Sequence, residues 1–394
     1  MAVSDRGRIV LKRGRDKPVR GGNPWIFSQA IDLVEPSSLE PGATVEIADA
    51  AGAALGYGHY NPQTTIAVRM LASRDEPGPD RIVDYRISHA MRLRERIIAG
   101  ETDCYRLVNG DGDGFPGVVI DRYGDAFVVQ LLTAGADRMR DRIVAALEKL
   151  MHPRSVIERS QGAVRKREGL EDRAGLLHGE DLSEVVVFEN GIRIQVDLAH
   201  GQKTGYFLDQ RDSRMSVRRL AATSVLDAYC YAGGFTLAAL VGGATRVVAI
   251  DTSARALSWA RRNLTLNAYA DAPVEFIHGE AAHYMAQCAP EFNLIVLDPP
   301  PLARSIKDVA RAGHLYVELN ALAMRALRPG GYLMTFSCSA HFRGEDFVRA
   351  VRIAQAKSGR NFRMIARLGA APDHPVLLGH PEGEYLTGVM LADL

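Results

Sequence analysis

Residues 225–235 read VLDAYCYAGGF, and this stretch decides the fold of the C-terminal half of the chain. Its first two residues are apolar and predict a short strand, and a helical pattern begins at Thr236. Gly233 and Gly234 lie in the turn between strand and helix. Glycines at such a turn let the backbone approach a ligand at the carboxyl edge of a sheet. The stretch therefore predicts the first strand–turn–helix unit of a ligand-binding α/β domain.

A carboxylate follows the next predicted strand, 247–250. Asp251 is placed there to accept hydrogen bonds from both hydroxyls of a ribose. The glycine turn is not GxGxxG, so a dinucleotide diphosphate is not the expected ligand, and S-adenosylmethionine fits better. Glu280 follows the short strand 274–277 and either reaches the adenine amino group or is an ordinary acid at the start of a helix. The candidate cofactor-binding residues of these turns are Asp227, Tyr229, Gly233, Gly234, Asp251 and Glu280.

The rest of the C-terminal half alternates between strand and helix patterns. A hairpin is predicted first, because apolar runs flank Glu189-Asn190-Gly191. The alternation that follows predicts a parallel sheet with helices on both faces, which is a Rossmann-like doubly wound α/β fold. The predicted strands are 225–226, 247–250, 294–297 and 332–336, and the predicted helices include 254–266 and 308–327.

Two smaller modules are predicted before this domain. Residues up to about 74 read as short strands broken by turns, which suits a small β-barrel, and a Pro/Gly/Asp-rich stretch follows. A helix at 81–98, a strand–turn–strand at 105–132 and a helix at 137–150 then predict a small central α/β domain. The predicted domains are therefore 1–74, 75–184 and 185–394.

Composition and charge narrow the class of protein. The chain of 394 residues has 48 Lys+Arg and 47 Asp+Glu, but residues 6–20 are strongly basic. This run, with Arg13 and Arg15 as candidate RNA contacts, suits phosphate binding, and a solvated basic face is the alternative. No apolar run is long enough for a membrane span, and the glycine-rich loop 109–117 lacks a calcium pattern because Arg122 holds the twelfth position. The 4 scattered cysteines suggest reduced thiols in a cytoplasmic protein without a metal site.

Two further strand ends carry candidate catalytic groups. The strand 294–297 runs into Asp298-Pro299-Pro300, where the prolines fix φ and aim the carboxylate into the crevice. The next strand ends at Cys338. Cytosine C5 is a weak nucleophile, and a thiolate that adds to C6 makes C5 able to accept a methyl group. A lone cysteine is otherwise a small buried hydrophobe. We interpret Cys338 as the nucleophile.

With these motifs, the chain resembles the bacterial large-subunit (23S) ribosomal RNA cytosine-5 methyltransferases of the class I, S-adenosylmethionine-dependent type. These enzymes have an N-terminal PUA domain and a small central domain. The resemblance covers nearly the whole chain. Its specific stretches are 201–211, 231–235, 297–300, 336–339, 373–376 and 381–386.

The resemblance implies further site residues. It places 202–211 over the cofactor, Asp298 on the flipped cytosine as well as near the cofactor, and the N-terminal module on the RNA backbone. The chain departs from the family at Leu302, where the family commonly has an aromatic residue. It also departs at Val317, because the family has a Lys at this place, directly after the tyrosine. It has no cysteine after Pro300, so another base must remove the C5 proton. The implied cofactor contacts are Lys203, Tyr206, Asp209 and Arg211, and the implied substrate side holds Pro299, Pro300 and Tyr316.

Three other functions compete with this prediction. A methyltransferase acting on an exocyclic amine would use Asp298 without covalent catalysis. A non-catalytic RNA-binding assembly factor would hold the cofactor and transfer nothing. A small-molecule methyltransferase would leave the basic N-terminal module without a purpose. The sequence leaves open whether the protein is a monomer or a homodimer.

Overall fold

The protein is described from a computed structural model that covers residues 7–98, 102–303, 305–339 and 341–393. The chain forms two compact units. This division does not test the predicted boundaries of the three domains, which remain a prediction. The first unit comprises Met1–Val187, Val196–Tyr206 and Pro372–Gly383, and the second unit comprises Phe188–Gln195, Phe207–Ala371 and Glu384–Leu394.

The N-terminal part of the first unit is a six-stranded sheet with the strand order β2-β6-β5-β4-β1-β3. Only β1 and β4 pair in parallel, and the other neighbours are antiparallel. Alternate residues such as Ile9, Val45 and Val68 point into a common core. The elements are β1 Gly7–Leu11, α1 Lys17–Arg20, β2 Trp25–Phe27, β3 Ile31–Glu35, β4 Ala43–Ala48, β5 Ala54–Tyr60 and β6 Ile66–Ser73.

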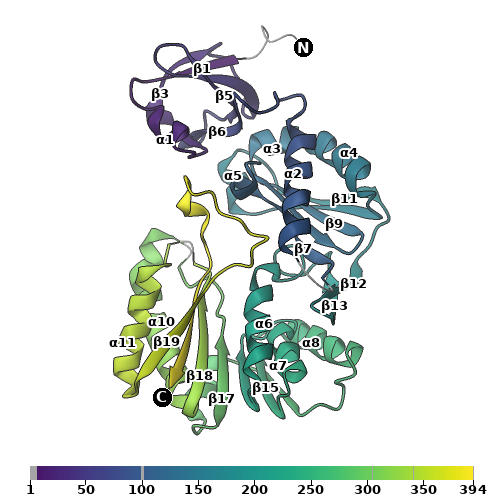
Figure 1. Cartoon of the computed structure of the whole chain (residues 1–394), viewed down its shortest axis with the longest axis vertical. Helices are drawn as coiled ribbons and strands as arrows, with labels where there is room; N and C mark the ends of the chain where they lie inside the picture. The colour runs from purple at the N-terminus through teal and green to yellow at the C-terminus, as the bar shows by residue number, and fades with distance from the viewer. Residues whose placement is uncertain (1–6, 99–101, 304, 340, 394) are drawn as a thin grey trace. The chain divides into compact units, whose positions relative to one another are not determined.

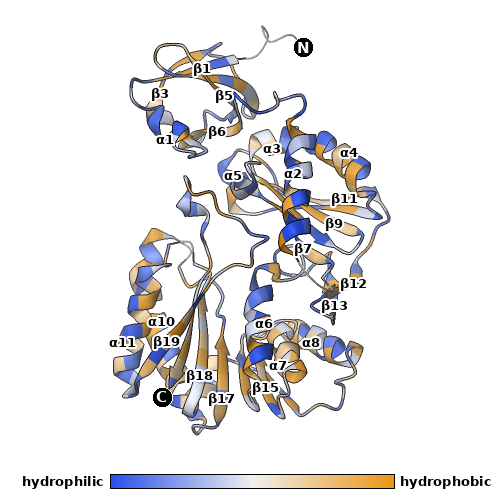
Figure 2. Cartoon of the chain, viewed as in Figure 1, coloured by the Kyte–Doolittle hydropathy of each residue, from blue (hydrophilic) through white to orange (hydrophobic). Residues whose placement is uncertain are grey.

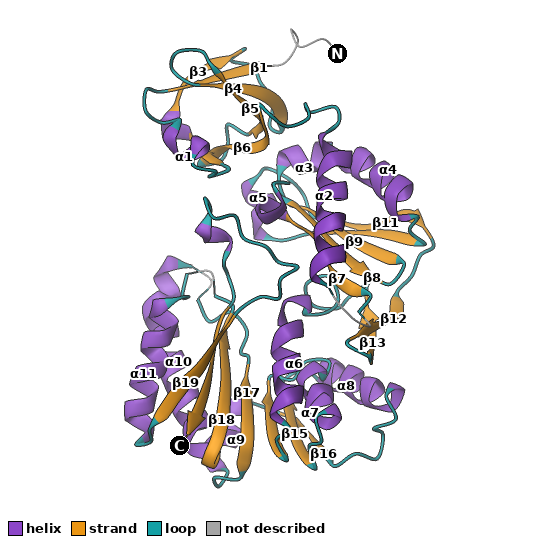
Figure 3. Ribbon diagram, viewed as in Figure 1, coloured by secondary structure: helices purple, strands orange, loops and turns teal. Residues whose placement is uncertain are grey.

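The central part of the first unit is a five-stranded sheet, in the order β11-β10-β9-β8-β7, with helices packed against it (Figure 3). The helix predicted at 81–98 is confirmed as α2. The helix predicted at 137–150 is divided at Met139, where ψ is 4°. The elements are α2 Ile82–Ile97, β7 Cys104–Asn109, β8 Val118–Tyr123, β9 Ala126–Leu131, α3 Ala134–Arg138, α4 Arg140–Met151, β10 Ser155–Ser160, α5 Ala163–Arg167 and β11 Arg173–Gly179.

The predicted hairpin is confirmed between β12 (Glu184–Glu189) and β13 (Ile192–Asp197). Its two turn residues, Asn190 and Gly191, have φ values of 51° and 79°. Both central residues of a type I′ turn need a positive φ, which explains the Asn-Gly pair.

The second unit is built on a seven-stranded sheet in the order β16-β15-β14-β17-β18-β20-β19. The predicted parallel, doubly wound arrangement is confirmed for β14 to β18. Strand β20 is antiparallel to both of its neighbours. The strands are β14 Ser224–Ala228, β15 Arg246–Asp251, β16 Val274–His278, β17 Phe292–Leu297, β18 Leu327–Ser337, β19 Phe362–Leu368 and β20 Thr387–Asp393. The helices are α6 Arg211–Leu220, α7 Gly234–Val241, α8 Ala254–Leu266, α9 Ala281–Gln287, α10 Val309–Ala326 and α11 Glu345–Ser358.

Helices cover both faces of this sheet (Figure 1). Leu226, Val248 and Leu333 face the layer of α9, α10 and α11, whereas Ala249 packs with Leu257 of α8 on the other side. The central strands are therefore mostly apolar, as the orange colour of β15 and β17 shows (Figure 2). The chain leaves β14 toward β15 and β16 and returns to β17. In such sheets, ligands bind where the strand order reverses, outside the carboxyl ends of the strands.

Candidate active site

The turn after β14 has a left-handed backbone and packs closely against α8. Tyr229, Tyr231 and Gly233 all have positive φ values, of 68°, 47° and 79°. A Cβ added at Gly233 would lie 3.0 Å from the Cβ of Ala260, so a side chain there would crowd α8. The side-chain amide of Asn263 donates to the carbonyl of Ala232 at 3.1 Å and fixes the turn against α8.

Asp251 ends β15 and lies beside this turn. Its Oδ2 accepts a hydrogen bond from the Tyr231 amide at 2.9 Å, and its Oδ1 accepts one from the Ser253 amide at 2.8 Å. Each carboxylate oxygen can accept a second bond, so the group stays able to receive ribose hydroxyls. Glu280 is exposed just before α9, on the neighbouring strand end.

Asp227 is the most strongly perturbed acid at this edge of the sheet. It is 1% exposed, and its Oδ2 accepts a hydrogen bond from Thr236 Oγ1 at 2.7 Å. Its Oδ1 has no hydrogen-bond partner among the residues that the structure describes. The pKa of this carboxyl is raised from 3.8 to about 6, mainly by burial and also by the charge of Asp251, against the lowering effect of the Thr236 hydrogen bond.

These acids fit a nucleoside ligand that carries a cation. Asp251 offers oriented oxygens to a ribose, and Asp227 offers a buried carboxylate oxygen to a positively charged donor such as an ammonium group. The donors and acceptors therefore suit S-adenosylmethionine.

The two predicted catalytic residues lie at the ends of adjacent parallel strands. Asp298 follows β17 and is half-buried, and its Oδ2 accepts a hydrogen bond from Gln210 Nε2 at 3.0 Å. Cys338 follows β18, and its Sγ lies 3.7 Å from the carbonyl oxygen of Pro299. Pro299 is buried and Pro300 is exposed. Cys338 is half-buried and its thiol lies beside the Asp-Pro-Pro turn.

Tyr316, expected on the substrate side, lies fully buried in α10. Its hydroxyl is 3.1 Å from Ser339 Oγ, which is also fully buried. Burial raises the pKa of Tyr316. The sequence reasoning gave Ser339 no role, although the residue adjoins Cys338.

The stretch 202–211 is divided between the units. In the first unit, Lys203 is exposed and Tyr206 is buried, and Thr204 Oγ1 between them donates to Asp121 Oδ2 at 2.6 Å. The Tyr206 amide donates to Tyr123 Oη at 3.2 Å. These bonds hold the loop against β8.

In the second unit, Asp209 and Arg211 are both buried. The carbonyl of Asp209 accepts a hydrogen bond from the Ala371 amide at 2.8 Å, and its Oδ2 accepts one from Tyr385 Oη at 2.6 Å. Arg211 Nε lies 3.5 Å from Asp212 Oδ1. Asp209 therefore holds the chain on both sides of the segment Pro372–Gly383.

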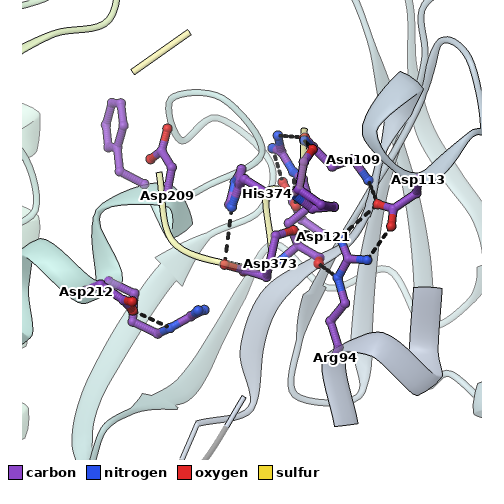
Figure 4. Close-up of polar contacts among 12 residues, drawn as sticks. Arg94, Asn109, Asp113, Asp121, Asp209, Asp212, Asp373 and His374 are labelled. Carbon is purple, nitrogen blue, oxygen red and sulfur yellow. Dashed lines mark hydrogen bonds and ion pairs between the residues drawn. The ribbon is translucent and has the colours of Figure 1, made fainter. Parts of the chain in front are cut away.

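The Asp-His-Pro stretch at 373–375 belongs to the first unit, and Figure 4 shows how it is held. Asp373 is fully buried, and its Oδ2 accepts a hydrogen bond from the Arg106 amide at 2.9 Å. Its carbonyl accepts a bond from Arg94 Nη2 at 2.6 Å, and Arg94 forms a two-pronged ion pair with Asp113. Sequence reasoning gave this stretch only as a shared motif, and the structure shows it as a buried anchor.

The remaining expectations concern RNA, metals and membranes. Arg13 and Arg15 are exposed between β1 and α1. Among the described residues, no group of three or more His, Cys, Asp or Glu side chains could hold a metal ion. None of the helices in the described part of the chain is both long and apolar enough to cross a membrane.

Comparison with known proteins places these features in a family. A model of S-adenosylmethionine-dependent methyltransferases matches residues 117–380, and a model of PUA-like domains matches residues 9–73. The chain is 40% identical over 388 residues to the ribosomal RNA large subunit methyltransferase I of Photobacterium profundum, which covers 96% of this chain and 98% of that protein. The Klebsiella pneumoniae protein of the same name is 38% identical, with 97% of each chain covered.

Solved structures show the same fold at lower identity. A methyltransferase in complex with SAH has a TM-score of 0.83 at 21% identity, with 98% of this chain and 99% of that chain covered. An S-adenosylmethionine-dependent methyltransferase from Streptococcus mutans gives 0.81 at the same identity and coverage. The predicted PUA-like module, the Rossmann-like domain and the cofactor are thereby confirmed.

Proposed function

Because the chain belongs to the ribosomal RNA large subunit methyltransferase I family, we propose that it methylates cytosine C5 in large-subunit (23S) ribosomal RNA. The observation that carries the proposal is the Cys338 thiol, 3.7 Å from the Pro299 carbonyl at the carboxyl edge of the sheet. A thiolate there serves a pyrimidine that must be activated before it accepts a methyl group. A ribosomal RNA substrate would place the enzyme in the cytoplasm.

S-adenosylmethionine, when bound, supplies the methyl group. We assign its ribose to Asp251, its amino-acid ammonium group to Asp227 and its adenine amino group to Glu280. We also assign a close approach of the ligand to the backbone of the turn at Gly233 and Gly234, where Gly233 has a φ of 79°. The further contacts that we propose are Lys203, Tyr206, Asp209, Arg211, Tyr229 and Asp298.

Cys338 and Asp298 then act on the target base. The Cys338 thiolate forms a bond to C6, which breaks the C5–C6 double bond and makes C5 nucleophilic. Asp298 accepts a hydrogen bond from the N4 amino group and holds the base in register. After C5 has gained the methyl group, a base removes the C5 proton, the C6–S bond breaks, and the double bond and the thiolate are restored.

The N-terminal module binds RNA in this proposal. Arg13 and Arg15 are exposed in a basic loop, where phosphate groups can reach them. Pro299 and Pro300 line the base side of the turn. Tyr316 is buried, so it supports this side from beneath and does not contact RNA.

The test is covalent trapping with ribosomal RNA that contains 5-fluorocytosine, in the presence of S-adenosylmethionine. Fluorine at C5 cannot leave as a proton does, so the C6–S bond persists. We expect a protein–RNA adduct that maps to Cys338 and is absent in Cys338→Ala. Cys288→Ala is the matched control, because that half-buried thiol also lies 3.7 Å from a carbonyl, that of Met285.

Each competing function gives a different outcome. A methyltransferase acting on an exocyclic amine would methylate RNA without an adduct, and Cys338→Ala would stay active. An assembly factor would leave RNA unmethylated, and ribosomal RNA from a deletion strain would lack no methyl group. Either outcome refutes the cytosine-5 mechanism.

A further inference from the structure

The turn that carries Asp298 has few hydrogen-bond donors of its own. Residues 299–301 are all proline and have no backbone N–H. The first two amides after them, of Leu302 and Ala303, both donate to the same atom, Ser339 Oγ, at 3.0 Å and 3.2 Å. One hydroxyl on β18's extension therefore holds the turn that follows β17.

The chemistry of that hydroxyl settles the direction of its third bond. A serine oxygen has two lone pairs and one proton, and the two amides occupy the lone pairs. The proton is left to point at Tyr316 Oη, 3.1 Å away, so Ser339 donates and Tyr316 accepts. All three partners are buried or half-buried, where an unpaired polar group is costly.

Tyr316 is itself fixed by packing. Its ring lies parallel to that of Phe342, with the centroids 5.1 Å apart and the planes 8° apart. Two further hydrogen bonds link Phe342 to the residues on either side of Cys338. Ser337 Oγ donates to the Phe342 carbonyl at 2.7 Å, and the Phe342 amide donates to the Ser339 carbonyl at 3.0 Å. Tyr316, Ser339 and Phe342 thus form one rigid support.

We infer that Ser339 and Tyr316 are positioning residues that fix the Cys338 thiol relative to the Asp298 turn. The inference rests on the proposed covalent mechanism. Cys338 and Ser339 are neighbours, so their Cα atoms are about 3.8 Å apart. The hydrogen bonds of the Leu302 and Ala303 amides to Ser339 therefore also set the distance between the Cys338 thiol and the turn that carries Asp298. Both positioning residues are buried and act without touching the substrate.

The test compares Ser339→Ala and Tyr316→Phe with a matched control, Thr335→Val. Thr335 is also fully buried in β18, but its hydroxyl has no hydrogen-bond partner among the described residues. For each variant we would measure the first-order rate of adduct formation on 5-fluorocytosine RNA, the KM for RNA and the Kd for S-adenosylhomocysteine.

Ser339→Ala should slow adduct formation by about tenfold to a hundredfold, because a misplacement on the order of 1 Å has that effect on a reaction between oriented groups. The KM and the Kd should stay within about twofold of the wild-type values, which a general loss of structure would not allow. Tyr316→Phe keeps the ring stacked and both amide bonds, so its effect should be smaller but in the same direction. Thr335→Val should react at the wild-type rate.

The outcomes separate this inference from the proposed function. If Tyr316→Phe and Ser339→Ala form the adduct as fast as Thr335→Val, the positioning role is wrong while the nucleophile stands. If Ser339→Ala loses cofactor affinity and rate in equal measure, its role is structural and the inference is again wrong. A wild-type enzyme that methylates RNA without any adduct overturns both.

Discussion

Replacing Asp227 with asparagine should stabilise the second unit at neutral pH and weaken its cofactor site. Burial raises the pKa of Asp227 from 3.8 to about 6. A shift of about two pKa units corresponds to about 3 kcal/mol. Because the folded-state pKa is the higher one, the stabilising contribution is present below about pH 4 and is lost as the pH rises through about 6. Above that range the buried carboxylate destabilises the fold, and an asparagine would not.

The free energy of unfolding of Asp227→Asn should therefore exceed that of the wild type at pH 8, by at most about 3 kcal/mol, since the new amide is itself buried. The difference should shrink toward zero near pH 4. The chain has 2 tryptophans, Trp25 in the first unit and Trp259 in the second. In a Trp25→Phe background, urea unfolding followed by Trp259 fluorescence reports on the second unit alone.

Asp271→Asn is the control, because it removes an exposed carboxylate of the same unit. Added S-adenosylhomocysteine should raise the stability of the wild type more than that of Asp227→Asn, since at a given concentration a ligand that binds more tightly stabilises the folded state more. The reasoning fails if Asp227→Asn is destabilising by the same amount at pH 5 and pH 8. It also fails if the variant binds the ligand as tightly as the wild type.

Three further perturbations test other parts of the structure. Asp113→Ala leaves a buried arginine without its carboxylate and should lower the unfolding free energy of the first unit by about 3–5 kcal/mol, measured by Trp25 fluorescence. Asp75→Ala, which breaks an exposed pair, should change it by less than about 1 kcal/mol, and equal effects would contradict the buried network. The double variant Arg13→Ala, Arg15→Ala should weaken RNA binding and reduce the slope of log K against log salt by about 1.5, unless these side chains do not contact phosphate. Gly233→Ala forces a Cβ into a left-handed turn, at a cost of about 1–2 kcal/mol, and should weaken S-adenosylhomocysteine binding in calorimetry; an unchanged Kd would mean that the turn does not approach the ligand.

Local patterns predicted the elements whose signals are local. The helix expected at 254–266 agrees with α8, and the Asn190-Gly191 turn agrees with its hairpin. The division of the helix expected at 137–150 could not be predicted, because Met139 carries no helix-breaking signal. The reversed direction of β20 could not be predicted either, since its apolar run is the same in either direction and its pairing with β18 depends on residues about 50 to 60 positions earlier.

In the candidate site, too, features with local signals could be predicted and features set by long-range contacts could not. Acidic residues at strand ends were predictable as neighbours, because parallel strands bring their carboxyl ends to one edge. The place of Tyr316 was not, since a tyrosine serves equally in a core or on a surface. Its burial depends on Ser339, 23 residues further along, and on the ring of Phe342. Such long-range pairs leave no periodic trace in the sequence.

The anchoring of Asp373 also affects when, during synthesis, the first unit can finish folding. The first unit contains most of the N-terminal half of the chain, but it also requires Pro372–Gly383, close to the C-terminus. A nascent chain that has passed Val187 therefore lacks the carboxylate and carbonyl that Arg106 and Arg94 bind. The first unit cannot complete its packing until the ribosome has translated nearly the whole message, and no continuous gene fragment encodes either unit intact.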